Sequence, residues 1–134
     1  MKLSALGKYR NVGLLAMRLG LGLSFVCHGY PKLAGGAPLW QKLGGAMGAL
    51  GIHAVPGVWG LAAALAEFGG GVLLLLGFYF RVAALLLTVI MLVAFNMHLS
   101  KGDPFNAYSH ALELAVVFFG LLLVGPGRLS VDGE

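Results

Sequence analysis

The side chains in this sequence that are best suited to chemistry are ionisable groups inside long apolar segments. Arg18, Glu67 and Glu113 each interrupt such a segment, and His110 lies one helical turn from Glu113. A charged side chain at the centre of a bilayer costs at least about 2.5–3.5 kcal/mol on insertion scales, so such groups are rare and usually functional. Carboxylates and an imidazole in this setting can carry protons, and we predict Glu67, Glu113 and His110 as catalytic residues.

A second set of polar side chains lies near the ends of the apolar segments. His28, Lys32 and His98 carry hydrogen-bond donors, and Lys32 follows His28 by four residues, which places both on one helix face. Together with the guanidinium of Arg18, they are predicted to bind a ligand. No two histidines have metal-site spacing on one helix, so no metal site is predicted.

The composition indicates the class of protein that holds these residues. Of the 134 residues, 59% are hydrophobic and only 10% are charged, whereas a soluble domain carries about 25% charged residues to cover its surface. An ordinary soluble domain is therefore excluded, and residues 1–134 are predicted to form one small integral membrane domain in a lipid bilayer. The formal net charge is +4, but the basic residues are scattered without a run, so no nucleic-acid partner is predicted.

Four apolar segments are long enough to cross a bilayer as helices, since each crossing needs about 20 residues. They lie at about residues 11–30, 57–77, 81–99 and 105–124. Between the first two, Leu39, Leu43 and Met47 recur at helical spacing, which favours a short interfacial helix at about residues 38–50 over an irregular glycine-rich loop. The predicted fold is an all-α, four-helix transmembrane bundle with one interfacial helix.

An even number of spans places both termini on one side of the membrane. The basic residues are Lys2, Lys8, Arg10, Arg81 and Arg128 on that side, and Lys32, Lys42 and Lys101 on the other. Cytoplasmic segments are the ones enriched in Lys and Arg. We therefore predict a multi-pass protein of the inner or plasma membrane whose N- and C-termini are cytoplasmic.

The depths of the charged groups predict where they meet. At about 1.5 Å of rise per residue, Arg18 and Glu67 differ in depth by about 6 Å, which an arginine side chain can cover. We expect Arg18, Glu67 and Glu113 to point inward, with Arg18 bridging to one or both carboxylates in a polar column that opens to the outer face. The alternatives are a purely structural ion pair and histidines that are ordinary interfacial residues.

The chain contains a single cysteine, Cys27. An internal disulfide or a dithiol redox centre is therefore excluded. Any electrons for a redox reaction would have to come from outside the chain.

The order and spacing of these residues resemble the DoxX family of small four-helix membrane proteins. The matching elements are Arg18, His28-Gly29-x-x-Lys32, Glu67-Phe68-Gly69-Gly70, Gly77 with Arg81, His98, Glu113 and the ending Gly125-Pro126-Gly127-Arg128-x-Ser130-x-Asp132. The namesake of that family is a subunit of a thiosulfate:quinone oxidoreductase. The resemblance implies a four-helix membrane fold and a redox role that involves a partner protein.

Three functions remain open from the sequence. The first is a redox-linked subunit that binds a quinone, with no covalently bound cofactor, and receives electrons from a redox partner protein. The second is a non-enzymatic protein that binds or transports a small solute, with Arg18 holding an anionic group. The third is a structural assembly subunit of a membrane complex, so the sequence does not establish whether the chain is an enzyme.

Overall fold

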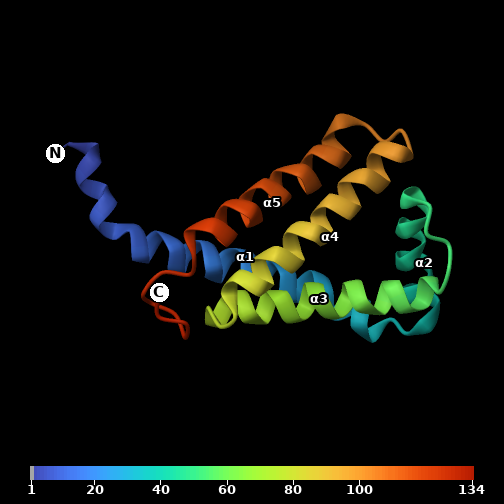
Figure 1. Ribbon diagram of the computed structural model, residues 1–134, viewed down its shortest axis with the longest axis horizontal. Helices are drawn as coiled ribbons and strands as arrows, with labels where there is room; N and C mark the ends of the chain where they lie inside the picture. Colours follow the sequence, from blue (N-terminus) through green and yellow to red (C-terminus); the bar gives the residue numbers. More distant parts are fainter. Residues whose placement is uncertain (1) are drawn as a thin grey trace.

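The computed structural model describes residues 2–134, and all of its regular elements are helices (Figure 1). Four of these helices are long and apolar enough to cross a membrane, which confirms the predicted all-α transmembrane class. They are α1 (Arg10–Ala34), α3 (Pro56–Leu76), α4 (Phe80–Ser100) and α5 (Phe105–Val124). A 3-10 helix, η1 (Leu3–Tyr9), precedes α1 and continues its apolar stretch.

The four long helices form two pairs, α1 with α3 and α4 with α5, and α4 also contacts α3. In Figure 1 the pairs lie close together at the end that carries both termini and diverge toward the opposite end. We call these the termini end and the α2 end. At the α2 end, α2 (Ala37–Gly44) packs on α3 and the 3-10 helix η2 (Gly45–Leu50) contacts α4. The short elements therefore bridge the opening between the two pairs.

Glycines allow α1 and α3 to lie in direct backbone contact. A Cβ added to Gly22 would come within 2.9 Å of the carbonyl oxygen of Gly71, and one added to Gly71 would come within 2.8 Å of the backbone nitrogen of Val26. Close packing of this kind substitutes for hydrophobic burial in a bilayer, where lipid tails are as apolar as side chains. This contact fixes the register of α1 against α3.

The buried core lies where the two helix pairs cross. The rings of Phe25 on α1 and Phe118 on α5 meet edge to face, with centroids 5.0 Å apart. Around them are buried Leu74, Phe80 and Leu87. Most other large apolar side chains are exposed, as expected for helices that contact lipid. The core thus joins the two pairs at one level and leaves the α2 end open.

Two segments differ from their sequence-based expectation. The first helix was expected to end near residue 30, but α1 continues through Pro31 to Ala34. The expected interfacial helix is present as two parts, α2 and η2, that meet at Gly44 and Gly45. The extra turn of α1 carries Lys32 toward α3, which determines the geometry of the site below.

Candidate functional site

An ion pair between α1 and α3 is the central polar contact among the spanning helices. Lys32 Nζ donates to Glu67 Oε2 over 2.8 Å, and the side chains are 35% and 7% exposed, respectively. The predicted inward position of Glu67 is therefore found, but its partner is Lys32 from the last turn of α1. Because the lysine keeps part of its surface free, it can also donate to a bound molecule.

The Lys32–Glu67 pair lies at the edge of a large cavity of about 620 Å³. The cavity is bounded by α3 and α4 and by the short elements α2 and η2. Its wall on α3 is built of small residues, which leaves room for a flat molecule. The lining includes Ala62, Ala63, Ala66, Val89, Val93, Ala94, Met97 and Trp59, with Lys32, Glu67, His98, Lys42 and Lys101 as its polar members.

A second polar pair lies on the α4 side of the same cavity. His98 Nδ1 is 2.7 Å from Asp103 Oδ2 in the turn that follows α4. A carboxylate on one ring nitrogen fixes the orientation of an imidazole and leaves the other nitrogen available. Asp103 was not among the predicted site residues. It lies in a turn, and the sequence does not show which side chain a carboxylate in a turn will contact.

The α2 segment holds Lys32 in place. Trp40 Nε1 donates to the carbonyl oxygen of Lys32 over 2.9 Å, which links α2 to the last turn of α1. Gly60 on α3 lies directly under Trp40, since an added Cβ there would collide with the Trp40 carbonyl oxygen. Trp40 therefore acts as a positioning residue for the last turn of α1.

Arg18 does not join this site, and the expectation that it bridges to Glu67 or Glu113 is wrong. The side chain is 2% exposed. Its Nε donates to Leu74 O (3.1 Å), Nη2 to Leu75 O (2.9 Å), and Nη1 to Leu129 O (2.6 Å) and Pro126 O (3.5 Å). The last carbonyls of a helix lack intrahelical partners and attract cations. The end of α3 and the C-terminal segment therefore satisfy the guanidinium without a carboxylate.

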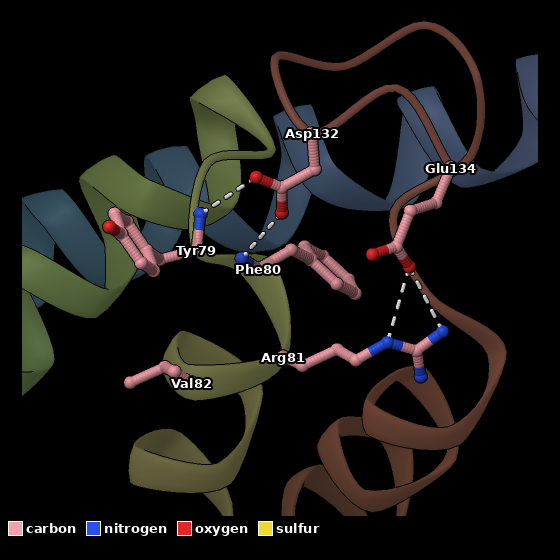
Figure 2. A pocket seen from close by; sticks show the side chains of 6 residues that line it. All are labelled: Tyr79, Phe80, Arg81, Val82, Asp132 and Glu134. Atoms are coloured by element: carbon pink, nitrogen blue, oxygen red, sulfur yellow. Dashed lines mark hydrogen bonds and ion pairs between the residues drawn. The ribbon is translucent and has the colours of Figure 1, made fainter.

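The C-terminal segment closes over Arg18 and is anchored at the start of α4 (Figure 2). Asp132 accepts hydrogen bonds from the backbone nitrogens of Tyr79 (3.1 Å) and Phe80 (2.9 Å), and Arg81 pairs with Glu134 at 3.1 Å. These contacts surround an open hollow of about 270 Å³. Asp132 caps the first turn of α4 and anchors the C-terminal segment there. The polar groups around this hollow therefore have structural roles.

Glu113, His110 and His28 lie outside the cavity. All three residues are exposed on the surface of the chain, and none lines the cavity. The expected inward position of Glu113 is wrong, because α5 turns its packed face, with Ala115 and Phe118, toward the other helices. The single polar column expected from helix depths is thus replaced by separate groups. Of the predicted site residues, the structure brings together Lys32, Glu67 and His98.

A family model described as DoxX matches residues 13–100, which is more than half of the chain. The chain belongs to the DoxX family. The match covers α1 to α4, so Lys32, Glu67 and His98 lie inside the part shared with other DoxX proteins, whereas α5 lies outside it.

Two relatives of this DoxX protein match nearly its whole length. An Escherichia coli K12 protein named "Inner membrane protein YqjF" is 33% identical over 128 residues, which is 93% of each chain. An uncharacterised protein of Haemophilus influenzae is 32% identical over 135 residues, covering 96% of this chain and 95% of the other. No solved structure is significantly similar to this chain. The relatives and the four apolar helices together identify a multi-pass membrane protein.

Proposed function

We propose that this DoxX protein is a redox-linked subunit that binds a quinone in the cavity between α3 and α4. The observation that carries the proposal is the Lys32–Glu67 pair at the edge of an otherwise apolar cavity of about 620 Å³. Small-molecule sites are typically 300–1,000 Å³ in volume, mostly apolar, and have a few placed polar groups. The cavity has each of these properties.

The donors in the cavity fit a quinone head group, which is flat and presents two carbonyl oxygens. Lys32 on α1 and His98 on α4 both line the cavity, so each can donate to one carbonyl oxygen of such a ring. The alanines of α3 leave space beside the ring plane, and Trp59 offers an aromatic face. A bound quinone supplies the capacity to accept two electrons and two protons.

The cavity is placed for a ligand that arrives from the bilayer. Two of its lining residues on α4, Leu86 and Val89, are 41% and 51% exposed, respectively. Exposed apolar surface on a spanning helix contacts lipid tails. A lipid-soluble molecule can therefore reach Glu67 by passing between α3 and α4 without crossing the water phase.

The chain's own residues supply proton handling at this site. Glu67 Oε2 accepts a hydrogen bond from Lys32 Nζ over 2.8 Å, which holds the lysine head group at the cavity edge. Lys32 can donate to a ligand oxygen while Glu67 holds a compensating charge. His98, oriented by Asp103 at the edge of α4, can exchange a proton with water. Cys27 is the only cysteine, so electrons come from a redox partner protein.

The charge distribution and the Escherichia coli relative support an inner-membrane location with cytoplasmic termini. In that orientation the α2 end faces outward, and the cavity with Lys32 and His98 lies in the outer half of the bilayer. The partner that supplies electrons would then act from the outer face.

Arg18 gives little support to the alternative of anion transport. Its donors are engaged by the carbonyls of Leu74, Leu75, Pro126 and Leu129, so a solute anion would have to displace contacts that hold α3 to the C-terminal segment. The open cavity beside Lys32–Glu67 supports a binding role over an ion pair that only fastens two helices, since both residues line a space that a ligand could fill.

The test is binding of decylubiquinone and of a menaquinone analogue to the purified protein in nanodiscs. The chain has two tryptophans, and Trp59 lines the cavity, so binding should quench tryptophan fluorescence. Glu67→Gln should raise the dissociation constant at least about tenfold, because it removes the charge-assisted contact that positions Lys32 for the ligand. His28→Ala, outside the cavity, should bind like the parent protein. Absence of saturable quenching with either compound would refute the proposal.

A further inference from the structure

Helix α5 exposes a stripe of polar and small residues along one face. The stripe consists of Asn106, His110, Glu113, Val117, Gly120 and Val124. These residues are spaced alternately four and three positions apart, which is the spacing of a helix seam that packs against a second helix. Asn106, His110, Glu113 and Val124 are exposed, and Val117 and Gly120 are half-buried. The opposite face of α5, with Ala111, Ala115 and Phe118, is already buried within the chain.

Two ionisable groups on this stripe lack partners at membrane depth. Glu113 is eight residues from the start of α5, about 12 Å along the helix. Within residues 2–134, neither Glu113 nor His110 makes a side-chain hydrogen bond or an ion pair. A carboxylate and an imidazole facing lipid tails are strongly unfavourable, so their exposure in one chain indicates that something else covers the stripe.

The stripe is complementary to itself. His110 can donate a hydrogen bond and Glu113 can accept one, and they are offset along the helix by only about 4.5 Å. When two identical surfaces meet across a two-fold axis, any contact of residue i with residue j of the partner is repeated by symmetry, so a pairing of His110 with the other copy's Glu113 would occur twice. The space over Gly120 is open, since an added Cβ would have no atom within 4 Å, so two helices can approach closely there.

We propose that a second copy of this chain covers the stripe, with α5 packed against α5 in parallel across a two-fold axis normal to the membrane. Glu113 of each copy accepts a hydrogen bond from the partner's His110. The interface satisfies both polar groups at once and leaves the α3–α4 cavity free, because none of its residues lines that cavity. The inference is independent of whether the cavity binds a quinone.

Disulfide cross-linking in isolated membranes tests the interface directly. In a Cys27→Ser background, Val124→Cys on the stripe, at a position that is 46% exposed, should give a cross-linked dimer of twice the monomer mass upon oxidation. Phe119→Cys is the matched control, since Phe119 is 53% exposed but lies on a different face of α5. It should give at least about tenfold less dimer. Equal cross-linking at both positions, or none at Val124→Cys, would overturn the proposal, as would cross-linking only to a different protein.

Energy transfer between labelled copies in liposomes tests the His–Glu contact. Glu113→Leu should lower the dimer fraction at least threefold at a fixed protein-to-lipid ratio, and His110→Leu should do the same. The exchanged variant, His110→Glu with Glu113→His, keeps one donor and one acceptor on the stripe and should restore dimerisation. If both single variants dimerise like the parent protein, the contact does not hold the copies together. Failure of the exchanged variant alongside losses in both single variants would also contradict the proposed pairing.

Discussion

Lys32 and Glu67 lie 35 positions apart in the sequence, yet their charged atoms meet at 2.8 Å between α1 and α3. The contact depends on two backbone features. The first is the continuation of α1 past Pro31 to Ala34, which carries the lysine to the level of the carboxylate. The second is the close glycine packing of α1 on α3, which shortens the distance between the two helices.

Removing one member of this pair should destabilise the protein more than removing both. Glu67→Gln or Lys32→Met alone leaves a partner without its counter-charge in a mostly apolar environment, whereas the double variant leaves none. We expect about 1–2 kcal/mol for each single change, limited by the partial exposure of the lysine, and a smaller loss for the double variant. Unfolding of the four proteins in detergent measures the coupling; additive losses would show that the two groups do not interact.

Arg18→Met should loosen the end of the chain that carries both termini. The substitution removes the donors to the carbonyl oxygens of Leu75 and Leu129, and a buried carbonyl left without a partner costs about 1–3 kcal/mol. Leu74 O loses one of two donors and keeps the backbone nitrogen of Gly77. Hydrogen exchange should increase at residues 125–134 and at the end of α3. Binding in the cavity should change much less, because Arg18 does not line it. Unchanged exchange in those segments would contradict the assigned role.

Gly77→Ala should destabilise the turn between α3 and α4, whereas Gly69→Ala should not. Gly77 has a φ of +65°, and an added Cβ would lie 2.8 Å from the guanidinium carbon of Arg18. A left-handed backbone and a steric clash together predict a loss of at least about 1–2 kcal/mol. Gly69 is the control, since a Cβ there meets no atom within 4 Å. Thermal unfolding of both variants tests this prediction, and equal unfolding midpoints for Gly77→Ala and Gly69→Ala would refute it.

Asp132→Ala should weaken the start of α4 and the anchoring of the C-terminal segment. The carboxylate accepts from the backbone nitrogens of Tyr79 and Phe80, and loss of a capping side chain costs about 0.5–2 kcal/mol. Limited proteolysis should therefore cleave near residue 130 faster than in the parent protein. Asp103→Ala, in the turn at the α2 end, is the comparison: it should leave C-terminal cleavage unchanged.

The four spanning helices were predictable because long apolar runs and their Pro and Gly boundaries are local features of the sequence. The partners of the charged side chains could not be predicted from the sequence. Arg18 is satisfied by backbone carbonyls, and these give no residue-specific signal. The outward position of Glu113 depends on which face of α5 meets its neighbours. Helix depth alone carries no information on that rotation, so the pairings predicted from depth were wrong.

Photoaffinity labelling with an azido-quinone, mapped by mass spectrometry in native-like membranes, tests the quinone site most directly. We predict labelling of α3 and α4 residues that line the cavity, such as Trp59, Ala63 and Met97. Excess unlabelled quinone should suppress that labelling, and Glu67→Gln should reduce it. Labelling spread over the lipid-facing surfaces of α1 and α5, unaffected by competitor or by Glu67→Gln, would contradict it.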